Sequence, residues 1–331
     1  MWSIARKLRQ LGIVGINQRN CDLVLPNNPR GLYPLVDDKL RTKKLATSVG
    51  IQVPELYATV ETEHDIRRFT TTLSELGEFV IKPVNGSGGR GILVVVGRHK
   101  RWWVKASGER VSELDIRRHL SNILSGIYSL GGTPDQALVE YRVQSHSVFE
   151  RIAYKGVPDV RVILYQGIPI MAMLRLPTRA SDGKANLHQG AVGVGVDLTT
   201  GLACGAVCHN EMISYHPDND EPLLDFQVPF WKDLRLLASR CFDLVPLGYM
   251  GVDIVIDQAF GPMVLELNAR PGLSIQICNK RGLMPSVHWV DEYRKCKGAL
   301  PTSADERSLL SESLLMPMDG ADCSDEIKAP Q

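Results

Sequence analysis

The chain has 331 residues, 44% of them hydrophobic and 23% charged, which is an ordinary globular composition with enough apolar material for two or three lobes. Its formal net charge of +1 argues against bulk binding to nucleic acid or to a membrane surface. No apolar run is long enough to span a bilayer, and the basic start of the chain lacks the apolar core of a signal peptide. Seven scattered cysteines favour a reducing compartment, so we expect a cytoplasmic protein.

Residues 1–36 are expected to form an N-terminal extension. Asparagine and arginine are concentrated over residues 17–30, which is typical of an ordered loop, although the sequence assigns it no role. A helix is predicted over residues 38–49 with Asp37 as its cap. Its basic residues, Lys39 among them, form a solvated face unless one of them reaches a phosphate.

Residues 37–136 are predicted to form a small α+β lobe around a glycine-rich turn. Helix starts are expected at Thr62 and Ser112, each followed three residues later by an aspartate that completes a capping pair. An apolar strand over residues 79–82 ends in a lysine, and a second strand covers residues 92–96. In the turn between them, glycines let backbone N–H groups close onto phosphate oxygens, while the lysine supplies a positive charge.

The turn contains the spacing G-x-G-x-x-G at Gly86, Gly88 and Gly91. A dinucleotide-binding fingerprint needs a helix after the glycines, but Ile-Leu-Val-Val-Val follows here and favours a strand. A Walker loop needs Gly-Lys-Ser/Thr after the glycines, and a protein kinase places its lysine after the glycine loop rather than before it. Two interpretations remain, a hairpin that covers phosphates and a plain glycine hairpin.

Residues 137–297 are predicted to form a second lobe on an antiparallel sheet of about six strands. The expected strands are residues 137–143, 159–165, 169–176, 191–198, 250–257 and 263–267. A helix over residues 229–245 is expected to pack on this sheet, because its apolar residues recur at helical spacing. Residues 298–331 turn to Ser, Asp, Glu and Pro, and we expect them to be a disordered tail.

The last two of these strands form a hairpin that gathers three polar side chains. Strand alternation puts Glu266 and Asn268 on one face, and a turn near residue 260 places Asp253 opposite them. Three hard oxygen ligands on one patch suit Mg²⁺ that carries nucleotide phosphates. In the alternative interpretation, arginines neutralise these acids, since unpaired buried carboxylates would be costly. The candidate arginines are Arg161, Arg175 and Arg270.

Five segments of the chain occur in an order that is typical of one superfamily. They are FVIKPVNGSGGRG, ALVEYRV, PDVRVILYQG, KANLHQGAVGVGV and GVDIVIDQAFGPMVLELNARPG. Together they resemble the motifs of the ATP-grasp superfamily, and most nearly those of RimK-type α-L-glutamate ligases and their sugar-transfer-associated relatives. The resemblance implies an α+β fold of two lobes with the nucleotide between them and an antiparallel C-terminal sheet. It fails at the N-terminus, where such enzymes carry a complete α/β domain that is truncated or absent here.

The resemblance also implies which residues contact ATP, metal and substrate. The implied ATP contacts are Lys39 and Lys82 at the phosphates, Gly86, Ser87, Gly88, Gly89 and Gly91 in the lid, Glu140, Tyr141 and Val143 at the adenine, Asp159 near the ribose, and Lys184 and Asn186 closing on the triphosphate. The implied metal ligands are Asp253, Glu266 and Asn268, holding two Mg²⁺ ions, with Mn²⁺ as the alternative metal. Arg161 and Arg175 would face the γ-phosphate and the acyl phosphate. Arg270 replaces a small residue of RimK-type enzymes and would hold a substrate carboxylate.

The roles that the resemblance implies predict an ATP-dependent carboxylate–amine ligase. A carboxylate attacks the γ-phosphoryl group, and an amine captures the acyl phosphate to give an amide, ADP and phosphate. The expected partners are a glutamate-like donor and an amine acceptor, for which a peptide or protein is a candidate, with no nucleic acid. The alternatives are a phosphotransferase on the same scaffold and a nucleotide-binding partner protein without turnover. A second copy of the chain or another protein could replace the missing N-terminal domain.

Overall fold

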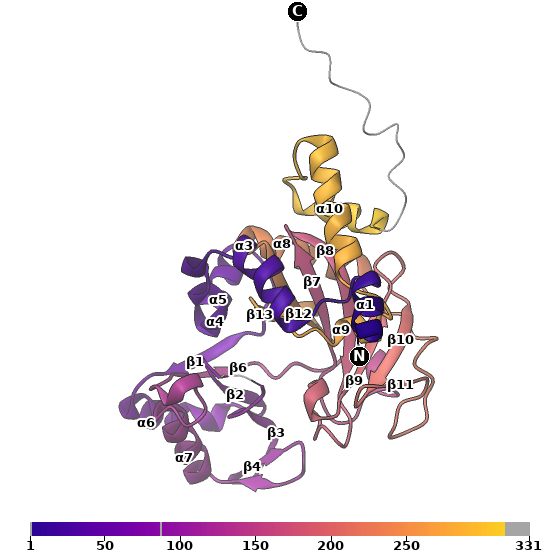
Figure 1. Cartoon of the computed structure of the whole chain (residues 1–331). Coiled ribbons are helices and arrows are strands. Elements are labelled where there is room, and N and C mark those ends of the chain that lie inside the picture. The colour runs from indigo at the N-terminus through magenta and orange to yellow at the C-terminus, as the bar shows by residue number, and fades with distance from the viewer. Residues whose placement is uncertain (1, 87, 315–331) are drawn as a thin grey trace, which may run out of the picture.

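Two antiparallel sheets, one in each lobe, form the framework of the computed structural model, which describes residues 2–86 and 88–314 (Figure 1). The first sheet has the strand order β1-β6-β2-β3-β4-β5. Its strands are β1 (Leu56–Val60), β2 (Phe79–Pro83), β3 (Leu93–His99), β4 (Trp102–Lys105), β5 (Arg110–Val111) and β6 (Ala137–Glu140). The second sheet has the order β11-β10-β9-β8-β7-β12-β13. Its strands are β7 (Asp159–Tyr165), β8 (Ile168–Leu176), β9 (Val192–Val196), β10 (Ala203–Cys208), β11 (Glu211–Ile213), β12 (Tyr249–Asp257) and β13 (Gly261–Asn268).

In the first lobe, helices α6 (Glu63–Thr72) and α7 (Glu113–Leu124) cover the sheet. Each begins with a capping box in which a hydroxyl and an aspartate exchange hydrogen bonds with backbone N–H groups, and this confirms the predicted starts at Thr62 and Ser112. The buried helix faces meet the apolar side chains of β2 and β3. Phe69 of α6, for example, lies edge-on to Phe79 of β2 with ring centroids 6.5 Å apart.

In the second lobe, α8 (Trp231–Leu244) packs against the long central strands, together with α9 (Ile275–Cys278) and α10 (Met284–Lys297). Strands β8 and β12 are buried along almost their whole length rather than on alternate residues. Both faces of this sheet are therefore covered, which explains why its strands read as nearly continuous apolar runs. The α+β class and the antiparallel second sheet agree with the prediction.

The strand over residues 137–143 was predicted in the wrong sheet. It is β6, four residues long, and it pairs with β1 and β2 of the first lobe through Val139 and its neighbours. All four residues are buried, so the segment shows no alternation that would reveal which sheet it joins. The first lobe therefore extends through Glu140, beyond the expected limit at residue 136. The short strands β10 and β11 were not predicted.

The N-terminal segment lies against the second lobe. It comprises α1 (Trp2–Gln10), α2 (Ile16–Gln18), a π-helical turn (Arg19–Val24), α3 (Leu25–Asn27) and α4 (Pro34–Asp37), and it leads into α5 (Lys39–Ser48). Val14, Leu23 and Val24 are buried in the core of the second lobe. Asn28, 3% exposed, donates to the carbonyl oxygens of Tyr249 and Ala269, which fixes the segment at the end of β12. Helix α5 is capped by Asp38, one residue after the predicted cap Asp37.

The C-terminal residues are more ordered than the composition predicts. We expected a disordered tail from residue 298, but α11 (Ala304–Leu310) packs on α8. Arg307 is 2% exposed and pairs with Asp243 of α8 at 2.5 Å, and Arg235 of α8 pairs in turn with Glu312. Charged side chains thus anchor a segment that has few large apolar residues. Residues 315–331 lie outside the described part of the chain.

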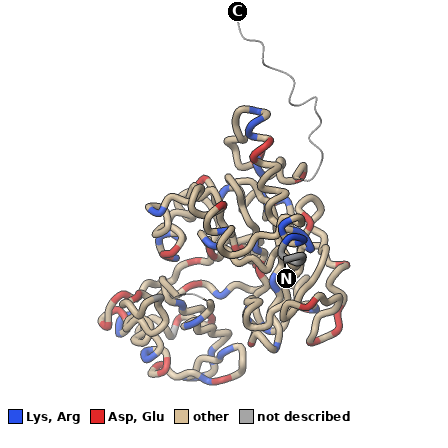
Figure 2. Tube along the Cα trace, in the orientation of Figure 1, with Lys and Arg blue, Asp and Glu red and all other residues tan. Residues whose placement is uncertain are grey.

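Charged residues of both signs are spread over both lobes, in keeping with the net charge of +1 (Figure 2). Within residues 2–86 and 88–314, no helix is long and apolar enough to cross a membrane.

Candidate active site

The glycine-rich turn joins β2 to β3, and its backbone needs glycine. Gly88, Gly89 and Gly91 have φ angles of +64°, +75° and +75°, a region that other residues rarely adopt. A Cβ at Gly91 would also lie 2.6 Å from the ring of Tyr128. A strand follows the turn, as predicted, so the element is a hairpin and not a dinucleotide-binding turn. Ser87 lies outside the described residues.

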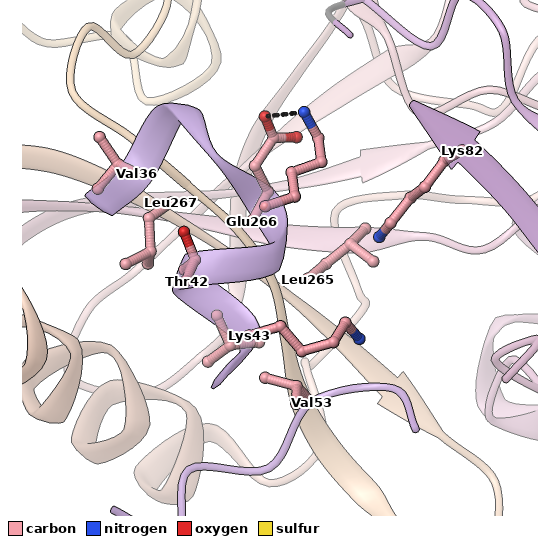
Figure 3. A pocket seen from close by; sticks show the side chains of 10 residues that line it. Val36, Thr42, Lys43, Val53, Lys82, Leu265, Glu266 and Leu267 are labelled. Carbon is pink, nitrogen blue, oxygen red and sulfur yellow. Dashed lines mark ion pairs between the residues drawn. The ribbon is translucent and has the colours of Figure 1, made fainter. Parts of the chain in front are cut away.

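Lys39, the first residue of α5, connects this hairpin to the second lobe. Its Nζ donates hydrogen bonds to the carbonyl oxygens of Gly86, at 2.7 Å, and Val84, at 3.3 Å. The same Nζ lies 3.8 Å from Oε1 of Glu266 on β13. The dashed line in Figure 3 marks this ion pair at the carboxylate of Glu266. One ammonium group therefore touches both the glycine-rich turn and a predicted metal ligand, although the two are far apart in the sequence.

Lys82 shares a buried carboxylate with a second lysine. Its Nζ lies 2.6 Å from Oε1 of Glu140, and Nζ of Lys43 lies 2.9 Å from Oε2. Burial alone would raise the pKa of Glu140, which is 3% exposed, but the two ammonium groups outweigh it and lower that pKa. Burial lowers the pKa of Lys43, despite its bond to Glu140. The resemblance implies that Glu140 lines the adenine, mostly through its main chain, and this stays a prediction; its side chain binds the two lysines.

Lys43 was missed by the sequence analysis. It lies one helical turn after Lys39, so both lysines project from the same side of α5. Figure 3 shows the ammonium groups of Lys43 and Lys82 pointing toward the same side of Leu265. The i, i+4 spacing was the signal that could have found it. These lysines and Glu266 line a pocket between the lobes, together with Thr42 of α5 and with apolar residues of α4, of β13 and of the loop that follows α5.

Two arginines of adjacent strands surround Asp253. Arg161 donates from Nε and Nη2 to its two carboxylate oxygens at 2.7 and 2.6 Å, and Nη2 of Arg175 donates to Oδ2 at 2.6 Å. Nε of Arg175 binds Asp159 at 2.5 Å. Burial raises the pKa of Asp253, but the arginines outweigh it and hold the pKa well below its usual range. Burial and the charge of Asp253 raise the pKa of Asp159 more than Arg175 lowers it.

This arrangement matches the alternative interpretation for Asp253. Both of its oxygens are already bound by guanidinium groups, so Asp253 is an anchor for arginines in this structure rather than an open metal ligand. Within the described ranges, no group of three His, Cys, Asp or Glu residues lies close enough to hold a metal ion. Arg270 does not join the cluster, because its guanidinium lies over the ring of Tyr33 at 5.2 Å.

Glu266 and Asn268 occupy one face of β13, as predicted. Asp253 and Glu266 are register partners across the β12–β13 ladder, with a bulge at the next pair. The Glu266 side chain is 41% exposed, and Oδ1 of Asn268 accepts a hydrogen bond from the backbone N–H of Arg270 at 2.8 Å. These two side chains supply hard oxygens of the kind Mg²⁺ prefers, so they fit the ion where phosphate and water oxygens complete its coordination.

The loop that carries Lys184 and Asn186 reaches the glycine-rich turn from the second lobe. Nε2 of Gln189 donates to the carbonyl oxygen of Gly88 at 3.2 Å, and a Cβ at Gly89 would lie 3.7 Å from Cδ of Lys184. Oδ1 of Asn186 accepts from the N–H of His188, which shapes the loop. The structure therefore brings the two predicted closing segments together. Gln189 was not predicted, because nothing in a polar loop sequence marks it.

Tyr141 and Val143 lie in the connection between the lobes. The Tyr141 hydroxyl donates to Oδ2 of Asp257 at 3.0 Å, and burial together with this bond raises its pKa to about 12. Val143 packs with Val255 and Met263, close to Leu265. This small apolar cluster borders the pocket through Leu265.

The chain matches the model of the family described as sugar-transfer associated ATP-grasp over residues 18–292. It belongs to this family. The match confirms the ATP-grasp superfamily and fold that the five ordered motifs predicted, while the RimK-type branch stays a prediction.

The sugar-transfer associated ATP-grasp chain resembles several solved ligase structures at low identity. An ATP-grasp ligase PsnB complexed with a minimal precursor has 17% identity and a TM-score of 0.40, over 74% of this chain and 56% of that one. D-cycloserine synthetase DcsG has 16% identity and a TM-score of 0.40, over 86% and 73% of the two chains. D-alanine–D-alanine ligase from Bacillus anthracis, complexed with ATP, has 13% identity and a TM-score of 0.43, over 86% of this chain and 67% of that one. The chain spans little more than half the length of PsnB, and no curated protein matches it.

Proposed function

We propose that this protein is an ATP-dependent ligase that joins a carboxylate to an amine through an acyl phosphate. The observation that carries the proposal is Lys39, whose ammonium group touches the glycine-rich turn at Gly86 and lies 3.8 Å from Glu266. This lysine marks a place where a phosphate chain can lie between a covering hairpin and an oxygen-rich strand. Positioning and charge neutralisation are the main requirements of phosphoryl transfer.

In this proposal ATP lies between the lobes. The apolar surface of Val143 and Leu265 would accept the adenine, and Tyr141 with the main chain of the connection would line its edge. Lys82 would reach the phosphates by exchanging the carboxylate of Glu140 for phosphate oxygens. Gly86 to Gly91 would cover the phosphates, with Lys184 and Asn186 closing from the other side.

Glu266 and Asn268 would hold Mg²⁺, which supplies charge neutralisation at the phosphates when bound. Asp253 and Asp159 would fix the guanidinium groups of Arg161 and Arg175 in one orientation, so that their positive charge faces the transferring phosphoryl group.

The two steps of the proposed reaction, formation of the acyl phosphate and its capture by the amine, need no protein nucleophile. A carboxylate oxygen of the substrate forms a bond to the γ-phosphorus as the bond from that phosphorus to ADP breaks. The amine nitrogen then attacks the acyl carbon, phosphate leaves, and the amine loses a proton. Glutamate-like acids are the first donors to test because of the resemblance to RimK-type ligases. Peptides are acceptors to test, since PsnB, a structure of similar fold, is described in complex with a precursor peptide.

The test is ADP release by the purified chain with Mg-ATP and pooled amino acids, with and without hydroxylamine. The proposal predicts release that depends on an amino acid, together with an acyl hydroxamate when hydroxylamine is present. Hydroxylamine traps acyl phosphates, so release with a phosphorylated product and no hydroxamate would favour the phosphotransferase instead. Nucleotide binding without release under any addition would favour the non-catalytic partner protein.

A further inference from the structure

The N-terminal segment brings an arginine to the catalytic end of β13. Nη1 of Arg19 donates to the carbonyl oxygens of Pro271 at 3.0 Å and Arg270 at 3.3 Å, and its other nitrogens donate to Oδ1 of the neighbouring Asn20. Arg19 has no carboxylate within ion-pair distance among the described residues. Its charge is held against the turn that follows the predicted metal ligands.

The same segment holds Arg270. The Arg270 guanidinium lies 5.2 Å from the ring centre of Tyr33, and its backbone N–H donates to Asn268. Burial raises the pKa of Asp37, and the charge of Arg270 counteracts this rise, but no ion pair within 4.0 Å joins the two residues. Arg270 is exposed and unpaired by any carboxylate in the described chain.

A buried hydroxyl nearby also lacks a partner. The Tyr249 side chain is fully buried, and its hydroxyl makes no hydrogen bond within the described chain. Burial raises the pKa of Tyr249, whereas the charges of Arg19 and Arg161 lower it. Arg19 and Arg270 are thus two cations at one turn that pair with no carboxylate in the described chain, and such cations favour the binding of an anion.

We propose that the N-terminal segment completes a subsite for a second carboxylate of the substrate, formed by the guanidinium groups of Arg19 and Arg270. The inference rests on the proposed ligase function and narrows its substrate class. The substrate would carry one carboxylate that is phosphorylated and another that stays free and is held by the two arginines. The exposed guanidinium group of Arg270 can donate two parallel hydrogen bonds to a carboxylate. Nη2 of Arg19 donates to Oδ1 of Asn20 and has a second N–H group for the same carboxylate.

The segment is fixed well enough to present Arg19 in one place. Asn28 binds the main chain of Tyr249 and Ala269 through three hydrogen bonds, and the side chain of Gln276 binds both the N–H and the carbonyl oxygen of Val14. These bonds tie the segment to the same turn that carries Arg270.

The test is calorimetric titration of the chain, saturated with Mg²⁺ and a non-hydrolysable ATP analogue, with succinate, glutarate and adipate and with the monoamide of each. We expect at least one dicarboxylate to bind more tightly than its monoamide. Arg19→Gln and Arg270→Gln should each weaken that dicarboxylate about 10- to 100-fold and remove the preference, since each removes charge-assisted hydrogen bonds. Affinity for the ATP analogue should stay unchanged. Arg30→Gln, at an exposed arginine of the same segment, is the matched control.

The outcomes separate this inference from the proposed function. A wild-type chain that binds the analogue but no dicarboxylate, or a preference that survives in both variants, overturns the inference alone. Failure of the wild-type chain to bind the analogue overturns the ligase proposal and this inference with it. Arg270 is exposed, so its variant keeps the test decisive even if Arg19→Gln disturbs the N-terminal segment.

Discussion

Replacing Glu140 with Gln tests the buried charge cluster of the first lobe. The carboxylate of Glu140 lies 2.6 Å from the ammonium of Lys82 and 2.9 Å from that of Lys43, and all three residues are buried. Glu140→Gln keeps the size of the side chain but removes its negative charge. Two buried ammonium groups then remain without a counter-ion. We therefore expect a large loss of stability.

The size of the stability loss in Glu140→Gln follows from the number of ammonium groups that are left without a counter-ion. Removing one partner of a buried ion pair costs about 3–5 kcal/mol, because the remaining charge stays in a poorly solvated place. Lys43→Met should cost no more than about 2 kcal/mol, since it leaves the Lys82–Glu140 pair intact and keeps the apolar stem. Combining Lys43→Met with Glu140→Gln should recover part of the loss, with a coupling energy of about 1–3 kcal/mol.

Urea denaturation measures the free energy of unfolding, and hydrogen exchange of the β2 and β6 amides reports the first lobe separately. The exchange measurement matters because the two lobes can unfold in separate steps. Glu78→Gln is the matched control, since Glu78 pairs with Arg142 at 2.7 Å but its side chain is 41% exposed. That change should cost about 1 kcal/mol or less. If Glu140→Gln lowers the free energy of unfolding no more than Glu78→Gln does, the ion pairs of Glu140 do not stabilise the first lobe as proposed.

Three further substitutions test other parts of the structure. Gly91→Ala should destabilise the protein by about 1–3 kcal/mol in thermal unfolding, because φ is +75° and the new Cβ would meet the ring of Tyr128. Gly108→Ala is the control: φ is +89° but the space around it is open, so it should destabilise by only about 1 kcal/mol. Tyr249→Phe should leave the melting temperature unchanged or raise it, since the buried hydroxyl has no partner, and a clear drop would mean that the hydroxyl is bonded. Arg307→Ala should destabilise by about 1.5–3 kcal/mol and expose α11 to limited proteolysis, because it removes a buried side chain that donates to the carbonyl oxygens of Thr302 and Ser239, while Asp243, 51% exposed, stays solvated. Uncut protein of normal stability would contradict the account of the C-terminal helix.

The local signals in the sequence predicted most of the elements, and the reasons are physical. The capping boxes at Thr62 and Ser112 involve residues three positions apart, so their hydrogen bonds are settled within the helix itself. The β12–β13 hairpin is equally local, and its register placed Asp253 opposite Glu266 as expected.

Features that depend on distant partners were not predictable in this way. The four apolar residues of β6 fit either sheet, and only the pairing with β1 and β2 decides between them. Which side chains bind Asp253 depends on the order of strands β7, β8 and β12 in the sheet. Arg161 is its register partner on β7, and Arg175 reaches it from β8. The role of Arg19 depends on how the N-terminal segment docks, and its own sequence carries no sign of that.

The most direct test of the active-site account is turnover in Glu266→Ala beside Glu211→Ala, an exposed glutamate on β11 of the same sheet. The account predicts that Glu266→Ala binds the ATP analogue but releases ADP at less than about a hundredth of the wild-type rate, since the proposed oxygen ligand of Mg²⁺ is lost. Glu211→Ala should behave like the wild type. Equal ADP release by the two variants would contradict the placement of the phosphates between Lys39 and Glu266.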